Sequence, residues 1–263
     1  MNKVVVITGV SSGIGLTTAK YLYKKGYKVY GLSRNTINDE NITSLKCDVT
    51  NLENVKEVFA YIYNIENRID VVINNAGMGV SGAIEYSTPE ELRKIFELNV
   101  FAVVGVCQEA IKYLRKSKGT IVNIGSVAGE LTIPFQTYYS MTKNSVSALS
   151  EGLRIELRPF GIKVSTVLPG DTKTNFTKNR TRPVIESDEL YKDRIKKSIE
   201  RMEKDEQNGV DPIVVSKTIY RVIKKKNPPV KVAVGFGYKV LVFLKRLLPN
   251  RFINYILYLM YGK

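Results

Sequence analysis

Short runs rich in β-branched residues alternate with longer segments of helical character along the chain. The runs are residues 4–8, 28–32, 70–74, 119–126, 163–169 and 230–234. Strands that alternate with helices over such distances form βαβ units, and these units build a parallel sheet covered by helices on both faces. The pattern therefore predicts a doubly wound α/β fold.

Two of the predicted helices begin or end at characteristic residues. The segment Ile14–Lys25 is predicted to close at Gly26, because glycine suits the position after a helix C-terminus. Residues Ser87–Glu91 supply an N-cap, a proline at the first helical position and early acids. They predict a helix that runs through Leu98.

The length of 263 residues allows one large domain or two small ones, and we predict a single domain over residues 1–235. Residues 171–210, the lid segment, are rich in Lys, Glu, Asn and Thr and are expected to cover the carboxyl edge of the sheet. Residues 236–263, the C-terminal extension, are expected to add short helices. The N-terminal residues enter a strand almost at once, so no targeting segment is expected.

A glycine-rich turn, Thr8–Gly15, directly follows the first strand and opens the first helix. Gly9 permits a tight turn, Gly13 lets the backbone approach a pyrophosphate, and Gly15 allows close packing of helix and strand. The spacing differs from G-x-G-x-x-G, and a purely structural turn is the alternative interpretation. The position at the first βα crossover favours a phosphate site. The other predicted cofactor contacts in this turn are Ser11, Ser12 and Ile14.

The second strand leads into Ser33-Arg34-Asn35, with no carboxylate where an NAD enzyme places one for the ribose hydroxyl. Arg34 can form a charge-assisted fork with a phosphate. These three residues predict NADP(H) as the cofactor. An ordinary surface arginine is the alternative interpretation.

The chain contains no histidine and two cysteines, Cys47 and Cys107. Ser-His-Asp and Cys-His hydrolases and histidine metal ligands are therefore excluded, and proton transfer must use Tyr, Lys, Asp, Glu or Cys. Two cysteines cannot complete a Cys₄ zinc site, and no metal is expected. Both are interpreted as packing residues, in a protein of the reducing cytoplasm.

Six motifs occur together in one order along the chain. They are Thr8-Gly9-x₃-Gly13-Ile14-Gly15, Asn74-Asn75-Ala76-Gly77, Asn99, Ser126, Tyr139-x₃-Lys143 and Pro169-Gly170. In this order and spacing the chain resembles the short-chain dehydrogenase/reductase family, over about residues 1–175. The resemblance implies a single-domain Rossmann fold and an oxidoreductase of CH–OH groups, commonly a dimer or tetramer.

The chemistry of such an activity explains the predicted catalytic set, Asn99, Ser126, Tyr139 and Lys143. Hydride transfer at a carbinol carbon creates or consumes an alkoxide, so one group must exchange a proton with its oxygen. Free tyrosine titrates near ~10, and a nearby cation favours the phenolate. Tyr139 and Lys143 have the spacing that places both on one helix face. By resemblance, Ser126 binds the substrate oxygen, Lys143 binds the nicotinamide ribose, and Asn99 holds a water that links Lys143 to solvent.

The resemblance also implies further cofactor contacts. Asp48 and Val49 resemble the pair that contacts adenine in the family, which follows the family's third strand. An exposed acid in a turn is the alternative interpretation of Asp48. The contacts implied around the adenosine ribose, the nicotinamide and the phosphates are Asn75, Ala76, Gly77, Tyr139, Lys143, Pro169, Gly170, Thr172 and Thr174.

The segments that flank the catalytic set are apolar, which suggests a lipophilic ketone or alcohol such as a steroid, retinoid, keto-lipid or β-ketoacyl thioester. The candidates for the pocket are Met78, Gly79, Val80, Leu131, Ile133 and Phe135, and the predicted substrate contacts are Ser126, Tyr139, Met78 and Phe135. The alternative interpretation is that several of these residues belong to the core.

The net charge of +15 is concentrated near the C-terminus. Residues 1–211 contain 29 Lys and Arg and all 25 acids, whereas residues 212–263 contain 11 Lys and Arg and no acid. The apolar stretches 237–248 and 252–260 are shorter than the ~20 residues that span a bilayer. They suit peripheral contact with a membrane, packing on the lid segment, or a subunit interface. A nucleic-acid partner is not expected, because no binding motif is present.

The leading prediction is an NADP(H)-dependent carbonyl reductase or alcohol dehydrogenase for a lipophilic substrate, working as a cytoplasmic homo-oligomer. A β-ketoacyl thioester reductase and a non-catalytic NADP-binding regulatory protein are the alternatives. The complete catalytic set argues against the regulatory protein, because a binding module does not need it.

Overall fold

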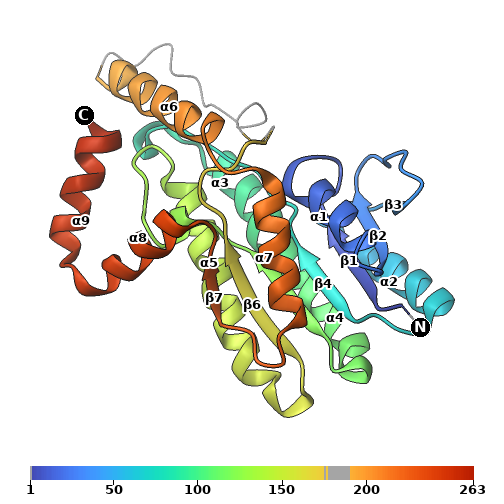
Figure 1. Cartoon of the computed structure of the whole chain (residues 1–263). Coiled ribbons are helices and arrows are strands. Elements are labelled where there is room, and N and C mark those ends of the chain that lie inside the picture. The colour runs from blue at the N-terminus through green and yellow to red at the C-terminus, as the bar shows by residue number, and fades with distance from the viewer. Residues whose placement is uncertain (1, 175, 177–189) are drawn as a thin grey trace.

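The computed structural model describes residues 2–174, 176 and 190–263 and contains one seven-stranded sheet (Figure 1). The strands are β1 (Val4–Thr8), β2 (Lys28–Ser33), β3 (Thr43–Lys46), β4 (Val71–Asn74), β5 (Thr120–Ile124), β6 (Lys163–Leu168) and β7 (Lys231–Ala233). They lie in the order β3-β2-β1-β4-β5-β6-β7, and every neighbouring pair is parallel. The predicted doubly wound α/β fold is confirmed.

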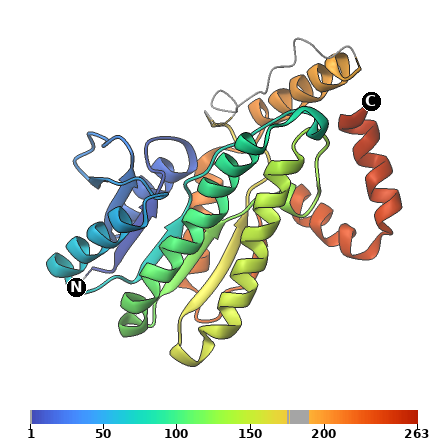
Figure 2. The same ribbon diagram turned by 180° about the vertical axis from the view of Figure 1, so that it is seen from behind.

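Alternate strand residues divide the core into two layers, because successive side chains of a strand point to opposite faces. Val4 and Val6 pack with α2 (Leu52–Glu66), α4 (Ala102–Ser117) and α5 (Thr137–Glu156). Val5 and Ile7 pack with α1 (Gly13–Tyr23) and α7 (Pro212–Lys224). Figure 1 shows α1 and α7 in front of the sheet, and Figure 2 shows the opposite layer.

Strand β3 is the one strand that the β-branched runs do not reveal. Its four residues, TSLK, are exposed or half buried, and the strand lies at the edge of the sheet. An edge strand with little burial does not need the continuous apolar run that marks a central parallel strand. Each of the six predicted runs contains one of the other six strands.

The predicted helix starts and stops are largely correct. Gly26 adopts φ +83° shortly after the end of α1. At the start of α3 (Pro89–Phe96), the Thr88 hydroxyl accepts from the Glu91 amide at 3.2 Å, and the Glu91 carboxylate accepts from the Thr88 amide at 2.9 Å. The helix does not continue regularly through Leu98, however, because Glu97–Phe101 forms a wider π-helical turn before α4.

The lid segment leaves the sheet after β6 and returns at a parallel bridge between Thr172 and Val210. Within it, α6 (Lys192–Gln207) packs Ile195, Ile199 and Met202 against Ala83 and Phe135. The rest of the predicted lid, residues 175 and 177–189, lies outside the described residues.

The C-terminal extension is helical, as predicted. It consists of α8 (Phe236–Leu247), α9 (Asn250–Leu257) and a final π-helical turn, Tyr258–Gly262. Figure 1 shows α8 leading away from the body of the protein and α9 turning back toward α6. Among the helices that the structure describes, none combines the length and the apolar character needed to cross a membrane.

Candidate active site

One cavity of about 1040 Å³ lies at the carboxyl ends of β1, β2, β4, β5 and β6. Residues that directly follow these strands line it, among them Gly9, Asn75, Ser126 and Pro169. Open parallel sheets bind ligands at this edge, where the strand order reverses between β1 and β4. The predicted cofactor, catalytic and substrate residues thus come together, and those that do not line the cavity are Gly15, Asn35, Asn99 and Phe135.

The turn after β1 is held tightly against the end of β4. The Thr8 hydroxyl accepts from the amides of Asn75 and Ala76, each at 3.0 Å, and the Asn75 side chain donates to the carbonyls of Thr8 and Gly9 at 3.0 and 2.9 Å. A Cβ at Gly15 would lie 2.2 Å from the Gly9 oxygen. Gly15 is therefore required for packing beneath the cavity.

The same turn presents the start of α1 to the cavity. Gly9 and Gly13 have φ values of +72° and +57°, which side chains other than glycine rarely adopt. Ser11 to Ile14 line the cavity, and the Ser12 side chain does not cap the helix. The first amides of α1 are consequently available to an anion, so the geometry fits a phosphate group.

The predicted adenosine end of the cavity carries a basic and an acidic side chain. Arg34 is exposed, lines the cavity and forms no salt bridge with any described residue. Asp48 accepts from the hydroxyl and the amide of Thr50, which hold the pKa of its carboxyl below the usual range; the charge of Arg34 adds to this effect. Ser33 donates to the Asn35 carbonyl at 2.7 Å and shapes the turn that presents Arg34.

Tyr139 and Lys143 lie one turn apart on α5, with the Lys143 ammonium 5.7 Å from the centre of the Tyr139 ring. Lys143 is buried and donates to the Ile124 carbonyl at 3.0 Å. Burial lowers the pKa of Lys143 to about 8, because the charged form loses hydration. Most Lys143 side chains still carry a proton at neutral pH, so the tyrosine has a cation beside it.

Asn99 lies in the π-helical turn, fully buried behind the cavity wall. Its side chain accepts from the Met78 amide at 2.9 Å and donates to the Met78 carbonyl and the Thr142 hydroxyl at 2.9 and 3.1 Å. Asn99 thereby ties the loop after β4 to helix α5. A Cβ at Gly77 would meet the Asn99 oxygen at 3.2 Å and the Lys143 ammonium at 3.5 Å, so the small residue between them leaves this space open.

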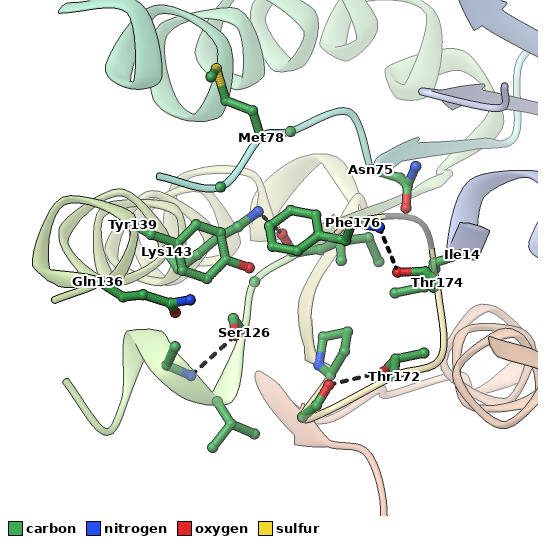
Figure 3. A pocket seen from close by; sticks show the side chains of 18 of the residues that line it. Ile14, Asn75, Met78, Ser126, Gln136, Tyr139, Lys143, Thr172, Thr174 and Phe176 are labelled. Atoms are coloured by element: carbon green, nitrogen blue, oxygen red, sulfur yellow. Dashed lines mark hydrogen bonds between the residues drawn. The ribbon is translucent and has the colours of Figure 1, made fainter. Parts of the chain in front are cut away.

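Ser126 follows β5 and caps a short 3₁₀ turn, Val127–Gly129, by accepting from the Ala128 amide at 3.1 Å. The turn packs directly on α5, since a Cβ at Gly129 would lie 2.8 Å from the Lys143 backbone. Asn144 also donates to the Gly129 carbonyl at 3.0 Å. These contacts fix Ser126 relative to Tyr139, and Figure 3 shows both side chains at the cavity.

The loop after β6 closes the other side of the cavity. The Thr172 hydroxyl donates to the Gly170 carbonyl at 2.9 Å, and Thr174 packs against Gly13. Figure 3 shows both threonine side chains at the cavity. The ring of Tyr238, from α8, covers Gly170 so closely that a Cβ there would lie 2.3 Å from it. The Tyr238 hydroxyl donates to the Asp171 carboxylate and accepts from the Asp171 amide.

Gln136 and Phe176 are two of the lining residues that were not singled out from the sequence, and both lie near Tyr139. Gln136 is 6% exposed, and its side chain forms no hydrogen bond with a described residue, so its amide faces the cavity beside Ser126 and Tyr139 (Figure 3). The ring of Phe176, in the lid segment, lies 5.5 Å from that of Tyr139. A buried amide at a helix start has no sequence signature that separates it from an ordinary cap.

Phe135 is placed differently from its prediction as a substrate contact. It has φ +60° and packs under α6 with Ala83 and Ile195 instead of lining the cavity. Met78, Leu131 and Ile133 do line it. Cys47 and Cys107 are buried in the core, as interpreted from the sequence, and burial raises their thiol pKa values to about 11 and about 12.

Comparisons with known proteins agree with this geometry. The short chain dehydrogenase family model matches residues 3–184. The chain is 40% identical to the 3-ketodihydrosphingosine reductase of Bacteroides thetaiotaomicron, over 99% of this chain and 98% of that protein. A solved short-chain dehydrogenase from Streptomyces avermitilis has 31% identity and a TM-score of 0.82, over 94% of this chain and 92% of that one. ElxO with NADP bound has 29% identity and a TM-score of 0.75, over 91% of this chain and 100% of that one.

Proposed function

Because the chain belongs to the short-chain dehydrogenase family, and is therefore an oxidoreductase of CH–OH groups, we propose that it interconverts a ketone and a secondary alcohol on a lipophilic substrate with NADP(H). The observation that carries this proposal is the cavity at the carboxyl edge of the sheet. It joins the phosphate-binding turn to Ser126, Tyr139 and Lys143 and continues along apolar walls.

The residues present fit NADP(H). The uncapped start of α1 suits the pyrophosphate, and Arg34 suits the 2′-phosphate, since no described carboxylate is bound to it. Asp48 is engaged by Thr50 and lies near that arginine. Bound NADPH supplies the hydride that reduces the substrate carbonyl.

The remaining steps belong to this chain. In the reducing direction, the Ser126 hydroxyl donates a hydrogen bond to the substrate oxygen and orients it, while the Tyr139 hydroxyl gives that oxygen its proton as the carbon receives hydride. The Tyr139 phenolate that results is stabilised by the Lys143 ammonium. Asn99 positions the Met78 loop, and the reverse reaction returns the proton to Tyr139.

The relative that matches almost the whole chain is named for a keto-sphingoid base, and this supports a long-chain keto-lipid as the substrate class. We expect NADPH oxidation with keto-sphingoid bases in a screen that also contains β-ketoacyl thioesters, steroids and retinals. Preference for thioesters would support the alternative reductase. NADPH binding without oxidation of any carbonyl substrate would support a regulatory protein.

Replacing the proposed proton donor tests the mechanism. Tyr139→Phe should lower kcat by at least about 10²-fold, because the substrate oxygen loses its proton source, while the Kd for NADPH changes little. Turnover and NADPH fluorescence titration measure the two quantities. Tyr138→Phe is the matched control, since Tyr138 does not line the cavity, and it should retain activity. Activity retained by Tyr139→Phe would rule out the proposed role.

The C-terminal extension supports a proposal of peripheral membrane contact. Its exposed apolar residues include Phe236, Phe243, Phe252, Tyr255 and Leu259. Four basic residues accompany them within α8 and α9, and residues 212–263 contain no acid. Apolar and basic side chains together suit the interface of an anionic bilayer.

A further inference from the structure

The active-site cavity continues beyond the reacting centre and reaches the C-terminal extension. Leu241 and Leu244 of α8, Ile256 and Leu257 of α9, and Met260 of the last turn line it together with Ser126 and Tyr139. These residues come after the part of the chain that the family model matches. The wall is therefore formed by the C-terminal extension, outside the residues that the family model matches.

The wall is aliphatic and incompletely covered. Leu244 and Ile256 are each 38% exposed although they line the cavity. Leu131 and Ile133 line the same cavity from the loop before α5. Within α8 and α9, which are both fully described, Lys245 is the single charged side chain of the lining. Burial of a hydrocarbon chain against such a surface is favourable. A polar ligand would find few hydrogen-bond partners there.

The two helices are anchored at both ends, to the loop after β6 and to α6. At the start of α8, Tyr238 is bonded to Asp171, next to Gly170. At the C-terminal end, Tyr261 donates to the Asp205 carboxylate at 3.0 Å, and Arg194 of α6 donates to the Gly262 carbonyl at 2.8 Å. The aliphatic wall is thus held beside the reacting centre by contacts within this chain.

We propose that α8 and α9 form a subsite for one long alkyl chain of the substrate, which runs from the carbonyl held by Ser126 and Tyr139 along Leu241, Leu244 and Ile256. The proposal rests on the proposed function, because the reacting carbonyl defines where the chain begins. It makes the length of the alkyl chain a determinant of specificity. The part of the chain that follows the family's matched region supplies that specificity.

The first test measures the reduction of methyl ketones that carry butyl, heptyl and decyl chains. With the complete protein, kcat/KM should rise by about three- to fourfold for each methylene that enters the subsite. Leu244→Trp should lower kcat/KM for the decyl ketone by about tenfold or more and leave the butyl ketone nearly unchanged, because the larger ring fills the path of the chain. Leu247→Trp is the matched control on the same helix, since Leu247 is exposed and does not line the cavity.

The second test needs no turnover. The protein contains no tryptophan, so each of these variants carries a single indole fluorophore. The decyl ketone, added at a concentration high enough to offset its weaker binding to this variant, should pack against the indole of Leu244→Trp and shift its emission to shorter wavelength. The emission of Leu247→Trp should stay unchanged.

Rates that are independent of chain length, or equal responses of the two variants, would overturn the alkyl-chain subsite even if the ketones are reduced. A selective emission shift of Leu244→Trp without reduction of any ketone would support the subsite and contradict the proposed function. The two proposals can therefore fail separately.

Discussion

Lys143 combines its proposed catalytic position with an environment that disfavours its charged form. It is 6% exposed, and its pKa falls from 10.5 to about 8 on burial. A shift of this size corresponds to a destabilisation of roughly 3 kcal/mol while both the folded and the unfolded chain are protonated, that is, below about pH 8. The buried ammonium that lies beside Tyr139 therefore lowers the stability of the fold.

Lys143→Met should therefore abolish turnover and raise the free energy of unfolding at neutral pH by about 1–2 kcal/mol, after the lost bond to the Ile124 carbonyl is subtracted. Between the folded pKa and 10.5 the folded protein loses this proton while the unfolded chain keeps it, so wild-type stability rises with pH. The difference in free energy of unfolding between wild type and Lys143→Met should therefore become smaller as the pH rises. Denaturant unfolding at several pH values measures it, with exposed Lys217→Met as the control. A variant less stable than wild type at neutral pH would contradict this account.

Arg34 is the residue on which cofactor choice should depend. Arg34→Ala should raise the KM for NADPH by about 10- to 100-fold, because a charge-assisted fork to the 2′-phosphate is lost. The KM for NADH should change little, since NADH has no phosphate at that position. Steady-state kinetics with both cofactors measure the ratio, and an equal effect on NADH and NADPH would refute the assignment.

At the scale of elements, Tyr238 connects α8 to the loop after β6. Tyr238→Phe removes the hydroxyl that bonds Asp171 and leaves the ring over Gly170. We expect a loss of about 1–2 kcal/mol in the free energy of unfolding and a several-fold rise in the KM for NADPH, because the loop loses one support. Thermal unfolding and kinetics test this prediction.

Tyr255→Phe, on the exposed side of α9, is the control for Tyr238→Phe and should change neither quantity. A normal KM in Tyr238→Phe would show that the loop is held without the Tyr238 hydroxyl.

The elements themselves were predictable to different degrees. Central strands need buried runs such as Val4–Thr8, and the α3 start needs a cap, so both leave local patterns in the sequence. The edge strand β3 and the π-helical turn at Asn99 leave no such pattern, because their form depends on what packs around them.

For the whole molecule, the C-terminal extension should govern attachment to anionic vesicles. The intact protein should sediment with phosphatidylserine-containing vesicles at low salt, and less so at high salt because the basic residues are screened. The double variant Phe243→Glu with Phe252→Glu should lose binding, since both residues are exposed and α8 and α9 carry them outward. Ile155→Glu, at a still more exposed position on α5, is the control. Unchanged binding of the double variant would refute membrane contact by the extension.

The composition and local spacing of this sequence determined the strand–helix alternation, the glycine turn at Gly9–Gly15 and the Tyr139–Lys143 pair, because each is encoded within a few neighbouring residues. Only the tertiary structure decided which of two adjacent residues serves the cavity: φ +60° at Phe135 directs that ring under α6, while Gln136 faces the site. It also showed that the C-terminal extension contacts α6 and the loop after β6, whereas its contact with a membrane stays a proposal. Contacts such as Tyr238–Asp171 join residues far apart in the chain, and no local pattern encodes them.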